Sequence, residues 1–326
     1  MTACEPTFRF LSNELQMIDQ NDIRAAYRRV AAHIRRTPLL DTQAGTFGLD
    51  HGVQLKLEFL QHAGSFKPRG AFNNLLSREV PAAGVAAASG GNHGIAVAHA
   101  ARALGHKARI FVPVISSPAK IAAIRARGAD LDIGGERYAD ALAACERYIA
   151  ETGALSVHAF DAWETIAGQG TLGLEWEEQA GGALDTVLVA TGGGGLIAGI
   201  AAWFAGRVKV VSVEPEGSQC LKAALEAGGP VDVGVESVAA DSLGARNCGP
   251  RVYAVASRHV AEAITVPDSD IVEAQRRAWA DARLALEPGG ATALAALVGG
   301  VYRPEQGERV GVLACGANVD LTTIAG

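Results

Sequence analysis

Residues 186–205 read TVLVATGGGGLIAGIAAWFA, and this stretch combines the features that decide the fold. Thr186 to Ala190 is a short apolar run typical of a buried strand, and Gly195 to Ala205 fits an amphipathic helix. Between them, successive glycines let the backbone turn tightly and direct several N–H groups to one point beside the positive end of the helix dipole. The stretch predicts a strand, an anion-binding loop and a helix, with a phosphate as the anion.

The same alternation of strand and helix extends over most of the chain. Further strands are predicted at 85–88, 108–112, 131–133, 208–213 and 310–314, and further helices at 94–104, 118–127, 138–151 and 219–227. This order predicts a mainly parallel, doubly wound α/β fold. Because 326 residues exceed the length at which one core stops growing, we expect two lobes. The small domain is expected at 84–160 and the large domain at 1–83 and 161–326.

Composition excludes several classes of protein. The formal net charge of −6 and the isoelectric point of about 5.8 argue against a nucleic-acid partner, which needs clustered Lys and Arg. No apolar run reaches the ~18 residues of a membrane helix, and the first 20 residues lack the pattern of a signal peptide. Five scattered cysteines without zinc-ligand spacing fit reduced thiols. We expect a cytoplasmic protein with neither a nucleic-acid nor a membrane partner, and disorder only in the first 15 to 20 residues.

A second glycine-flanked segment, Gly64 to Gly70, reads GSFKPRG and carries Lys67 among small and apolar neighbours. An amine becomes a useful nucleophile when its pKa is lowered or when it forms a Schiff base. A lysine beside a turn is more often simply solvated, so this segment alone does not identify a catalytic group. We expect a helix to follow it, from Arg69 to Arg78.

Two further loops follow predicted strands and carry polar groups. Ser89 to Gly94 reads SGGNHG, and its hydroxyl, amide and imidazole groups can hold a carboxylate and an oxygen of a cofactor ring. His93 by itself is as well explained by packing or by capping a helix. Cys315 to Asp320 reads CGANVD, and the thiol at the strand end can face a ring nitrogen. Taken alone, Cys315 is simply a small buried residue.

Together these motifs resemble the fold type II pyridoxal-phosphate enzymes, specifically the serine/threonine dehydratase and serine racemase group, over about residues 23 to 320. The resemblance implies pyridoxal 5'-phosphate as the cofactor and Lys67 as the residue that binds it covalently and acts as catalytic base. The other implied cofactor contacts are Phe66, Asn92, Gly192, Gly193, Gly194, Gly195, Glu287 and Cys315. Of these, the glycines would hold the phosphate, Asn92 the ring hydroxyl and Cys315 the ring nitrogen. The substrate carboxylate is expected at Ser89, Gly90, Gly91, Asn92 and His93.

The resemblance implies that the protein removes water from a β-hydroxy amino acid, L-threonine or L-serine, and releases a 2-keto acid and ammonia. Racemases of the group have a serine where this chain has Gly90, which favours dehydration because glycine cannot move a proton. Dehydration of hydroxyaspartate, phenylserine or another unusual β-hydroxy amino acid stays open, as does a serine racemase-like reaction. A non-catalytic nucleotide- or phosphate-binding protein is a more distant alternative.

Departures from the family pattern concern ions and substrate. Members that bind a divalent cation use an acid after the strand and a second carboxylate six residues on. Glu214 matches the first position, but Cys220 stands at the second, so a metal at Glu214 is doubtful and a monovalent ion or no ion is an alternative. Ser242 follows Asp241 where an Asp-Gly pair is usual, which is expected to reshape the pocket for the substrate side chain. A homodimer is expected from the resemblance.

Overall fold

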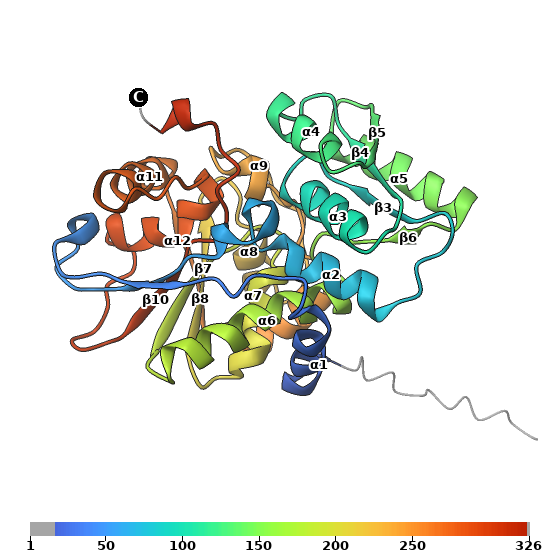
Figure 1. Cartoon of the computed structure of the whole chain (residues 1–326). Helices are drawn as coiled ribbons and strands as arrows, with labels where there is room; N and C mark the ends of the chain where they lie inside the picture. The colour runs from blue at the N-terminus through green and yellow to red at the C-terminus, as the bar shows by residue number, and fades with distance from the viewer. Residues whose placement is uncertain (1–16, 325–326) are drawn as a thin grey trace, which may run out of the picture.

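The larger of two sheets organises the molecule, whose computed structural model describes residues 17–324 (Figure 1). The disorder expected in the first 15 to 20 residues therefore falls almost entirely outside the described range. In the large sheet every neighbouring pair is parallel except β1 with β2. Its strand order is β1 (Leu39–Asp41), β2 (Gln54–Lys56), β10 (Val310–Leu313), β7 (Thr186–Ala190), β8 (Lys209–Pro215) and β9 (Glu262–Val266).

The smaller sheet is wholly parallel and is built from one continuous part of the chain. Its order is β5 (Asp130–Ile133), β4 (Ala108–Val112), β3 (Val85–Ala88) and β6 (Leu155–Ser156). Helices α3 (Asn92–Ala103), α4 (Pro118–Arg125) and α5 (Tyr138–Thr152) lie with this sheet at one side of the molecule in Figure 1. The expected domain bounds, 84–160, enclose these strands and stay a prediction.

The remaining helices surround the large sheet or join it to the small one. They are α1 (Gln20–Val30), α2 (Lys67–Ser77), α6 (Trp163–Ala180), α7 (Gly195–Phe204), α8 (Cys220–Ala227), α9 (Ala240–Leu243), α10 (Pro250–His259), α11 (Asp268–Ala282) and α12 (Pro288–Val298). Short 3-10 turns lie at η1 (Thr46–Gly48), η2 (Glu58–Leu60), η3 (His62–Gly64) and η4 (Leu321–Thr323). Within the described range, no helix combines the length and the hydropathy that crossing a membrane requires.

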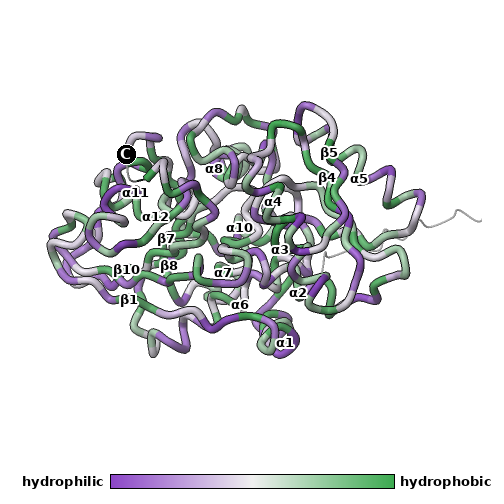
Figure 2. The backbone as a smooth tube through the Cα atoms, turned by 45° about the horizontal axis from the view of Figure 1, so that its top comes forward, coloured by the Kyte–Doolittle hydropathy of each residue, from purple (hydrophilic) through white to green (hydrophobic). Residues whose placement is uncertain are grey.

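The core lies where α6 and α7 pack together beside the large sheet. Every residue of α7 is buried, and the tube is mostly apolar around β7, β8 and α7 in Figure 2. Gly199 allows the two helices to touch, because a Cβ there would come within 2.5 Å of the backbone nitrogen of Gly170. Burial of this apolar surface is the main favourable term that holds β7 and the start of α7 in place.

The mainly parallel α/β architecture expected from the sequence is confirmed, with corrections at the ends of some elements, such as α3, which begins at Asn92 and not at residue 94. Helix α2 begins at Lys67, two residues before the expected start at Arg69. Pro68 explains the difference, because a proline near the first helical position carries no N–H that would need a partner there. Lys67 therefore lies on the first turn of a helix and not in the loop before it.

Candidate active site

The glycine loop between β7 and α7 forms a cradle without side chains. Gly194 adopts the left-handed conformation with φ of 80°, just before α7 begins at Gly195. A Cβ at Gly192 would lie 2.7 Å from Leu243 Cα, and one at Gly195 would lie 2.7 Å from Phe160 O. No larger residue fits at these positions, so the loop presents backbone N–H groups at the start of α7 to the pocket. This is the geometry of a phosphate site.

Lys67 lines the same pocket from its position on α2. Its Nζ donates a hydrogen bond to Ala159 O at 2.8 Å and lies 5.0 Å from the centre of the Phe66 ring. Burial of the ammonium lowers the pKa of Lys67 from 10.5 to about 8. An amine with this pKa exchanges a proton near neutral pH, as a catalytic base must.

The chain around Lys67 is joined to the chain around Cys315 by main-chain contacts. Ser65 and Gly316 form an isolated antiparallel bridge, and Phe66 N donates to Cys315 O at 3.1 Å. Cys315 is buried, its Sγ lies 3.5 Å from Gly289 O, and burial raises the pKa of its thiol. The lysine and the neutral thiol are thus held at fixed positions on the pocket wall.

Asn92 and Glu287 form the polar part of the pocket. Asn92 Nδ2 donates a short hydrogen bond to Glu287 Oε1, while Glu287 Oε2 is buried and has no hydrogen-bond partner in the described structure. Burial raises the pKa of Glu287 to about 7. Lys120 Nζ lies 3.7 Å from Glu287 Oε2 and also pairs with Asp241. Sequence reasoning missed Lys120 and named Asp241 only beside Ser242; the two side chains pair where α4 meets α9.

The loop expected to hold the substrate carboxylate lies next to Asn92. Gly91 precedes α3, and its N–H donates to Ser89 Oγ at 3.2 Å. A Cβ at Gly90 would overlap Ser116 Oγ, so this position has no room for a side chain. His93 is turned elsewhere, since its Nε2 donates to Val157 O at 2.8 Å, and burial lowers its pKa to about 3. His93 is therefore neutral and packed, and its role toward substrate stays a prediction.

The structure brings all of the expected cofactor residues to one pocket. Its lining includes Phe66, Lys67, Asn92, Gly192, Gly193, Gly194, Gly195, Glu287 and Cys315, together with Ser242, Leu243 and Phe160. Ser89, Gly90, Gly91 and His93 are absent from this lining. Phe160 is a residue that sequence reasoning missed, because it comes from the chain between β6 and α6 and belongs to no glycine motif.

Glu214 binds the backbone at the start of α8. Its carboxyl accepts hydrogen bonds from Leu221 N at 2.9 Å and Lys222 N at 2.8 Å, at the start of α8. Cys220 Sγ lies 3.3 Å from Gly192 O, so the thiol contacts the glycine loop. Among residues 17–324, no group of His, Cys, Asp and Glu side chains is arranged to hold a metal ion. Glu214 thus fixes α8 beside the glycine loop, and a cation there stays a prediction.

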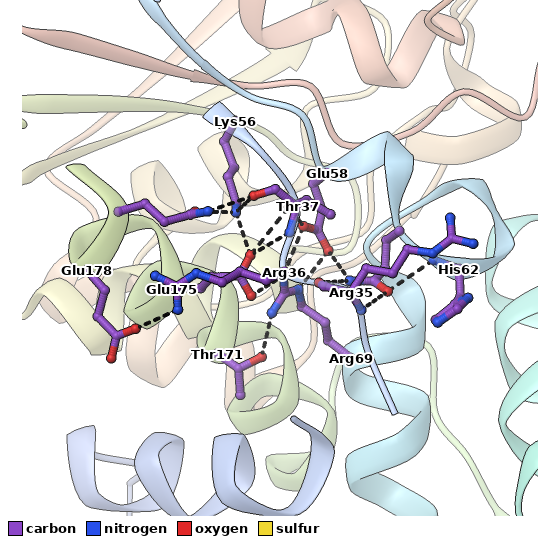
Figure 3. Close-up of polar contacts among 12 residues, drawn as sticks. Arg35, Arg36, Thr37, Lys56, Glu58, His62, Arg69, Thr171, Glu175 and Glu178 are labelled. Atoms are coloured by element: carbon purple, nitrogen blue, oxygen red, sulfur yellow. Dashed lines mark hydrogen bonds and ion pairs between the residues drawn. The ribbon is translucent and has the colours of Figure 1, made fainter. Parts of the chain in front are cut away.

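A buried charge cluster surrounds Arg69, two residues after Lys67 on α2, and Figure 3 shows its contacts. It consists of Lys56, Glu58, Arg69 and Glu175, all essentially inaccessible to solvent. Arg69 Nε and Nη2 reach the two oxygens of Glu58 at 2.7 and 3.0 Å, and Nη2 also contacts Glu175 Oε2 at 3.0 Å. Lys56 Nζ donates to Thr37 O, Glu175 and Gln179. The cluster holds α2, which carries Lys67, against α6 and β2.

Known proteins resemble this chain over almost its whole length. A family model described as "Pyridoxal-phosphate dependent enzyme" matches residues 30–316. A phenylserine dehydratase of Ralstonia pickettii is 40% identical over 312 residues, which cover 94% of this chain and 95% of that protein. An L-threonine ammonia-lyase of Geobacter sulfurreducens is 35% identical, over 95% of this chain and 78% of that protein.

Solved structures agree with these relatives. The crystal structure of the T.th. threonine deaminase superimposes with a TM-score of 0.87 and 36% identity, covering 93% of this chain and 99% of that one. The structure of maize serine racemase also gives a TM-score of 0.87, with 31% identity over 94% of this chain and 95% of that one. Both superpositions cover more than nine-tenths of this chain.

Proposed function

The chain belongs to the family of pyridoxal-phosphate-dependent enzymes, and on that premise we propose that it dehydrates a β-hydroxy amino acid to a 2-keto acid and ammonia. It is a lyase of the dehydratase and ammonia-lyase type, in agreement with the relatives that share nearly its full length. L-Threonine and L-serine are the substrates we put first. The non-catalytic alternative has no support, since the relatives are named as enzymes.

The pocket residues fit the cofactor. The glycine loop has the backbone donors and the helix start that a phosphate requires, and a side chain at Gly192 or Gly195 would fill it. Lys67 supplies an amine with a lowered pKa for the covalent link. Glu287 Oε2, which has no hydrogen bond in the described structure and lies 3.7 Å from Lys120 Nζ, marks a buried polar position on the pocket wall. Cys315, as a neutral thiol, offers a ring nitrogen only a weak partner.

Each residue has a definite part in the reaction. When bound, pyridoxal phosphate withdraws electrons from the substrate α-carbon and so makes its proton removable. Lys67 Nζ takes that proton, and its lowered pKa suits the task near neutral pH. Ser89 and the backbone of Gly90 and Gly91 hold the substrate carboxylate, and Phe66 and Phe160 keep water from the pocket.

The observation that supports elimination is that Lys67 lies on the pocket wall as a base, while Gly90 has no side chain that could act as a second base. Phenylserine is a second candidate substrate, because identity to the phenylserine dehydratase is 40% against 35% to the threonine ammonia-lyase. Hydroxyaspartate has no comparable support.

Racemisation stays the alternative reaction, and Ser116 is the residue that tests it. Its Oγ occupies the space that a side chain at position 90 would need, although neither residue lines the pocket that contains Lys67. If it acts there, the enzyme exchanges the α-proton and forms the D-amino acid beside the keto acid. Ser116→Ala would then abolish racemisation and leave elimination in place, as chiral chromatography of the reaction mixture would show.

The test of the proposed function is a substrate panel on the cofactor-loaded enzyme. Release of ammonia and keto acid is measured with threonine, serine, phenylserine, hydroxyaspartate and their stereoisomers. We expect one or more of these to be consumed with a kcat/KM at least about 10⁴ M⁻¹s⁻¹, the lower end for working enzymes. A loaded enzyme that consumes none of them would refute the proposal.

We also propose that the protein works as a cytoplasmic homodimer with two domains, 84–160 and the remainder. The resemblance supports the dimer, and the buried free thiols Cys145, Cys220, Cys248 and Cys315 support a reducing compartment. Light scattering of the purified protein gives the mass in solution, and a mass of one chain would refute the dimer.

A further inference from the structure

Asn318 lies three residues beyond Cys315, on the segment that follows β10. Its Nδ2 donates one hydrogen bond to Ala63 O at 2.8 Å and another to Asn92 Oδ1 at 2.8 Å. A side-chain amide has two N–H bonds, so both are used. Asn318 therefore joins the segment before Lys67 to the polar residue at the start of α3.

The direction of these hydrogen bonds follows from main-chain chemistry. A backbone carbonyl only accepts, so the atom of Asn318 that faces Ala63 O must be its nitrogen. That same nitrogen faces Asn92, so the atom of Asn92 on this side must be Oδ1. Asn92 Nδ2 then lies on the other side, where it donates to Glu287 Oε1. One carbonyl thus determines the orientation of two amides.

The neighbouring backbone leaves space for this arrangement. Gly64 adopts a left-handed conformation with φ of 70°, and a Cβ there would come within 2.5 Å of Asn318 Oδ1. Ala63, immediately before it, is left-handed too, with φ of 62°, which is unfavourable for a residue that carries a Cβ. Backbone strain at Ala63 and the absence of a side chain at Gly64 both bring the Ala63 carbonyl and Asn318 together.

We propose that Asn318 is a positioning residue for the cofactor, because it holds the Asn92 amide with its nitrogen toward the pocket so that Asn92 donates to the cofactor ring oxygen. This rests on the proposed function and on the contact of Asn92 with the ring hydroxyl that the family resemblance implies. Asn92 lines the pocket and is only 8% exposed, so its orientation is decided by protein partners and not by bulk water. Asn318 itself does not line the pocket and acts through Asn92.

Loss of Asn318 leaves Glu287 as the remaining side-chain partner of the Asn92 amide. A flipped Asn92 would place Oδ1 against Glu287 Oε1, which is repulsive when Glu287 is ionised and favourable when it is protonated. The groups that face Glu287 are Asn92 on α3, Lys120 on α4, Asp241 on α9, and Lys67 and Cys315 across the pocket. Without Asn318, the orientation of Asn92 therefore depends on pH near 7, where the pKa of Glu287 lies.

The experiment is a double-mutant cycle on cofactor affinity. Apoprotein is titrated with pyridoxal phosphate, and its dissociation constant is read from tryptophan fluorescence and the visible absorption band. Asn318→Ala is expected to raise the constant about 3- to 10-fold, the cost of one hydrogen bond. In an Asn92→Ala background the same change is expected to have less than about a twofold effect, because the partner is already gone. Asn318→Asp is expected to weaken binding more, since a carboxylate oxygen would face two acceptors.

A pH titration distinguishes positioning from a general loss of structure. In Asn318→Ala, the visible band is expected to depend on pH near 7 more strongly than in the unmodified enzyme, because protonation of Glu287 then also allows the Asn92 amide to flip. Asn73→Ala is the matched control: Asn73 Nδ2 also donates to a carbonyl, Glu164 O, and its Oδ1 accepts from Arg29 Nε, away from the pocket. Asn73→Ala should lower the melting temperature and leave the band and the dissociation constant unchanged.

Equal effects of Asn318→Ala in both backgrounds, or an unchanged dissociation constant in a folded Asn318→Ala or Asn318→Asp protein, would overturn the proposal. These readouts need no substrate. Failure of the substrate panel would therefore refute the proposed function and leave the role of Asn318 measurable.

Discussion

Two buried groups of charges, the buried charge cluster and the polar part of the pocket around Glu287, differ in how completely their hydrogen bonds are satisfied. In the buried charge cluster, Arg69 and Lys56 use their donors on carboxylates, carbonyls and hydroxyls, and no oxygen of Glu58 or Glu175 lacks a partner. In the pocket, Glu287 keeps one buried oxygen without a hydrogen bond. A saturated set of charges holds a helix in place, whereas an unsaturated one is available to a ligand.

The largest effect is expected when Lys67, the amine on the pocket wall, is removed. Lys67→Ala is expected to reduce turnover by more than about 10³-fold, since it removes the catalytic base and the covalent link. The visible absorption band should be lost while the melting temperature of the apoprotein stays close to that of the parent.

Lys107→Ala serves as the control, because Lys107 is exposed and its side chain has no hydrogen bond within the described structure. It should leave turnover and the band unchanged. A coloured, active Lys67→Ala protein would remove Lys67 from the mechanism.

Breaking the saturated cluster should affect stability and not chemistry. Glu175→Ala removes the carboxylate that pairs with Lys56 and that accepts one of the hydrogen bonds of Arg69. Lys56 would then be a buried charge without an anion, so we expect a loss of about 3 to 5 kcal/mol in the free energy of unfolding. Chemical denaturation followed by circular dichroism measures this loss.

Glu178→Ala is the matched control on the same helix. Glu178 forms an ion pair with Arg36, but its side chain is 51% exposed, and exposed pairs contribute about 0 to 1 kcal/mol. Similar losses for both variants would show that the cluster contributes no more than a surface pair.

Glu287 in the pocket and Glu175 in the buried charge cluster should change the free energy of unfolding in opposite directions as the pH rises. The pKa of Glu287 is raised to about 7 in the fold, so the folded apoprotein binds more protons between pH 4.5 and 7 and its stability falls as pH rises through that range. Glu175 is also buried, which opposes ionisation, but Arg69 and Lys56 hold its pKa below 4.5. Its contribution is present above pH 4.5 and is lost in more acidic solution.

The free energy of unfolding of the apoprotein should fall between pH 5 and pH 7. In Glu287→Gln this fall should be smaller by roughly 1 to 3 kcal/mol. Denaturation curves at the two pH values measure the difference. An unchanged slope in this variant would mean that Glu287 is ionised throughout the range.

The smallest effect is expected at Cys315. A serine hydroxyl can make the same contact with Gly289 O and is likewise neutral, so Cys315→Ser should change turnover by less than about threefold. Cys315→Asp, which puts a charge at the same place, should alter the visible band and its pH dependence. Equal behaviour of the two variants would show that this position does not interact with the cofactor.

The sequence predicted these two groups unequally, for physical reasons. The glycine loop, Lys67, Asn92 and Cys315 were found because each follows or begins a regular element and carries an unusual residue type. Strand β2 was missed because it has only three residues and includes Lys56, whose burial makes sense only once Glu175 lies opposite. Hydropathy treats such a lysine as exposed.

Other features depend on contacts that no local pattern contains. Lys120 belongs to an ordinary helix sequence, and its pairing with Asp241 arises only where α4 meets α9. Asn318 belongs to the motif Cys315 to Asp320, in which the thiol alone carries the predicted role. The earlier start of α2 did have a local signal, since Pro68 favours the first turn of a helix.

The main-chain link between the segments around Lys67 and Cys315 has a consequence for biosynthesis. The Asn318 amide and the Ala63 carbonyl are separated by 255 residues, and β10, which is synthesised long after β2, is inserted between β2 and β7. At about 5 to 20 residues per second, a ribosome needs on the order of 10 to 50 s between Ala63 and Asn318. The nascent chain therefore carries its lysine long before it has a pocket, and cofactor loading must wait until β10 and Asn318 have been made.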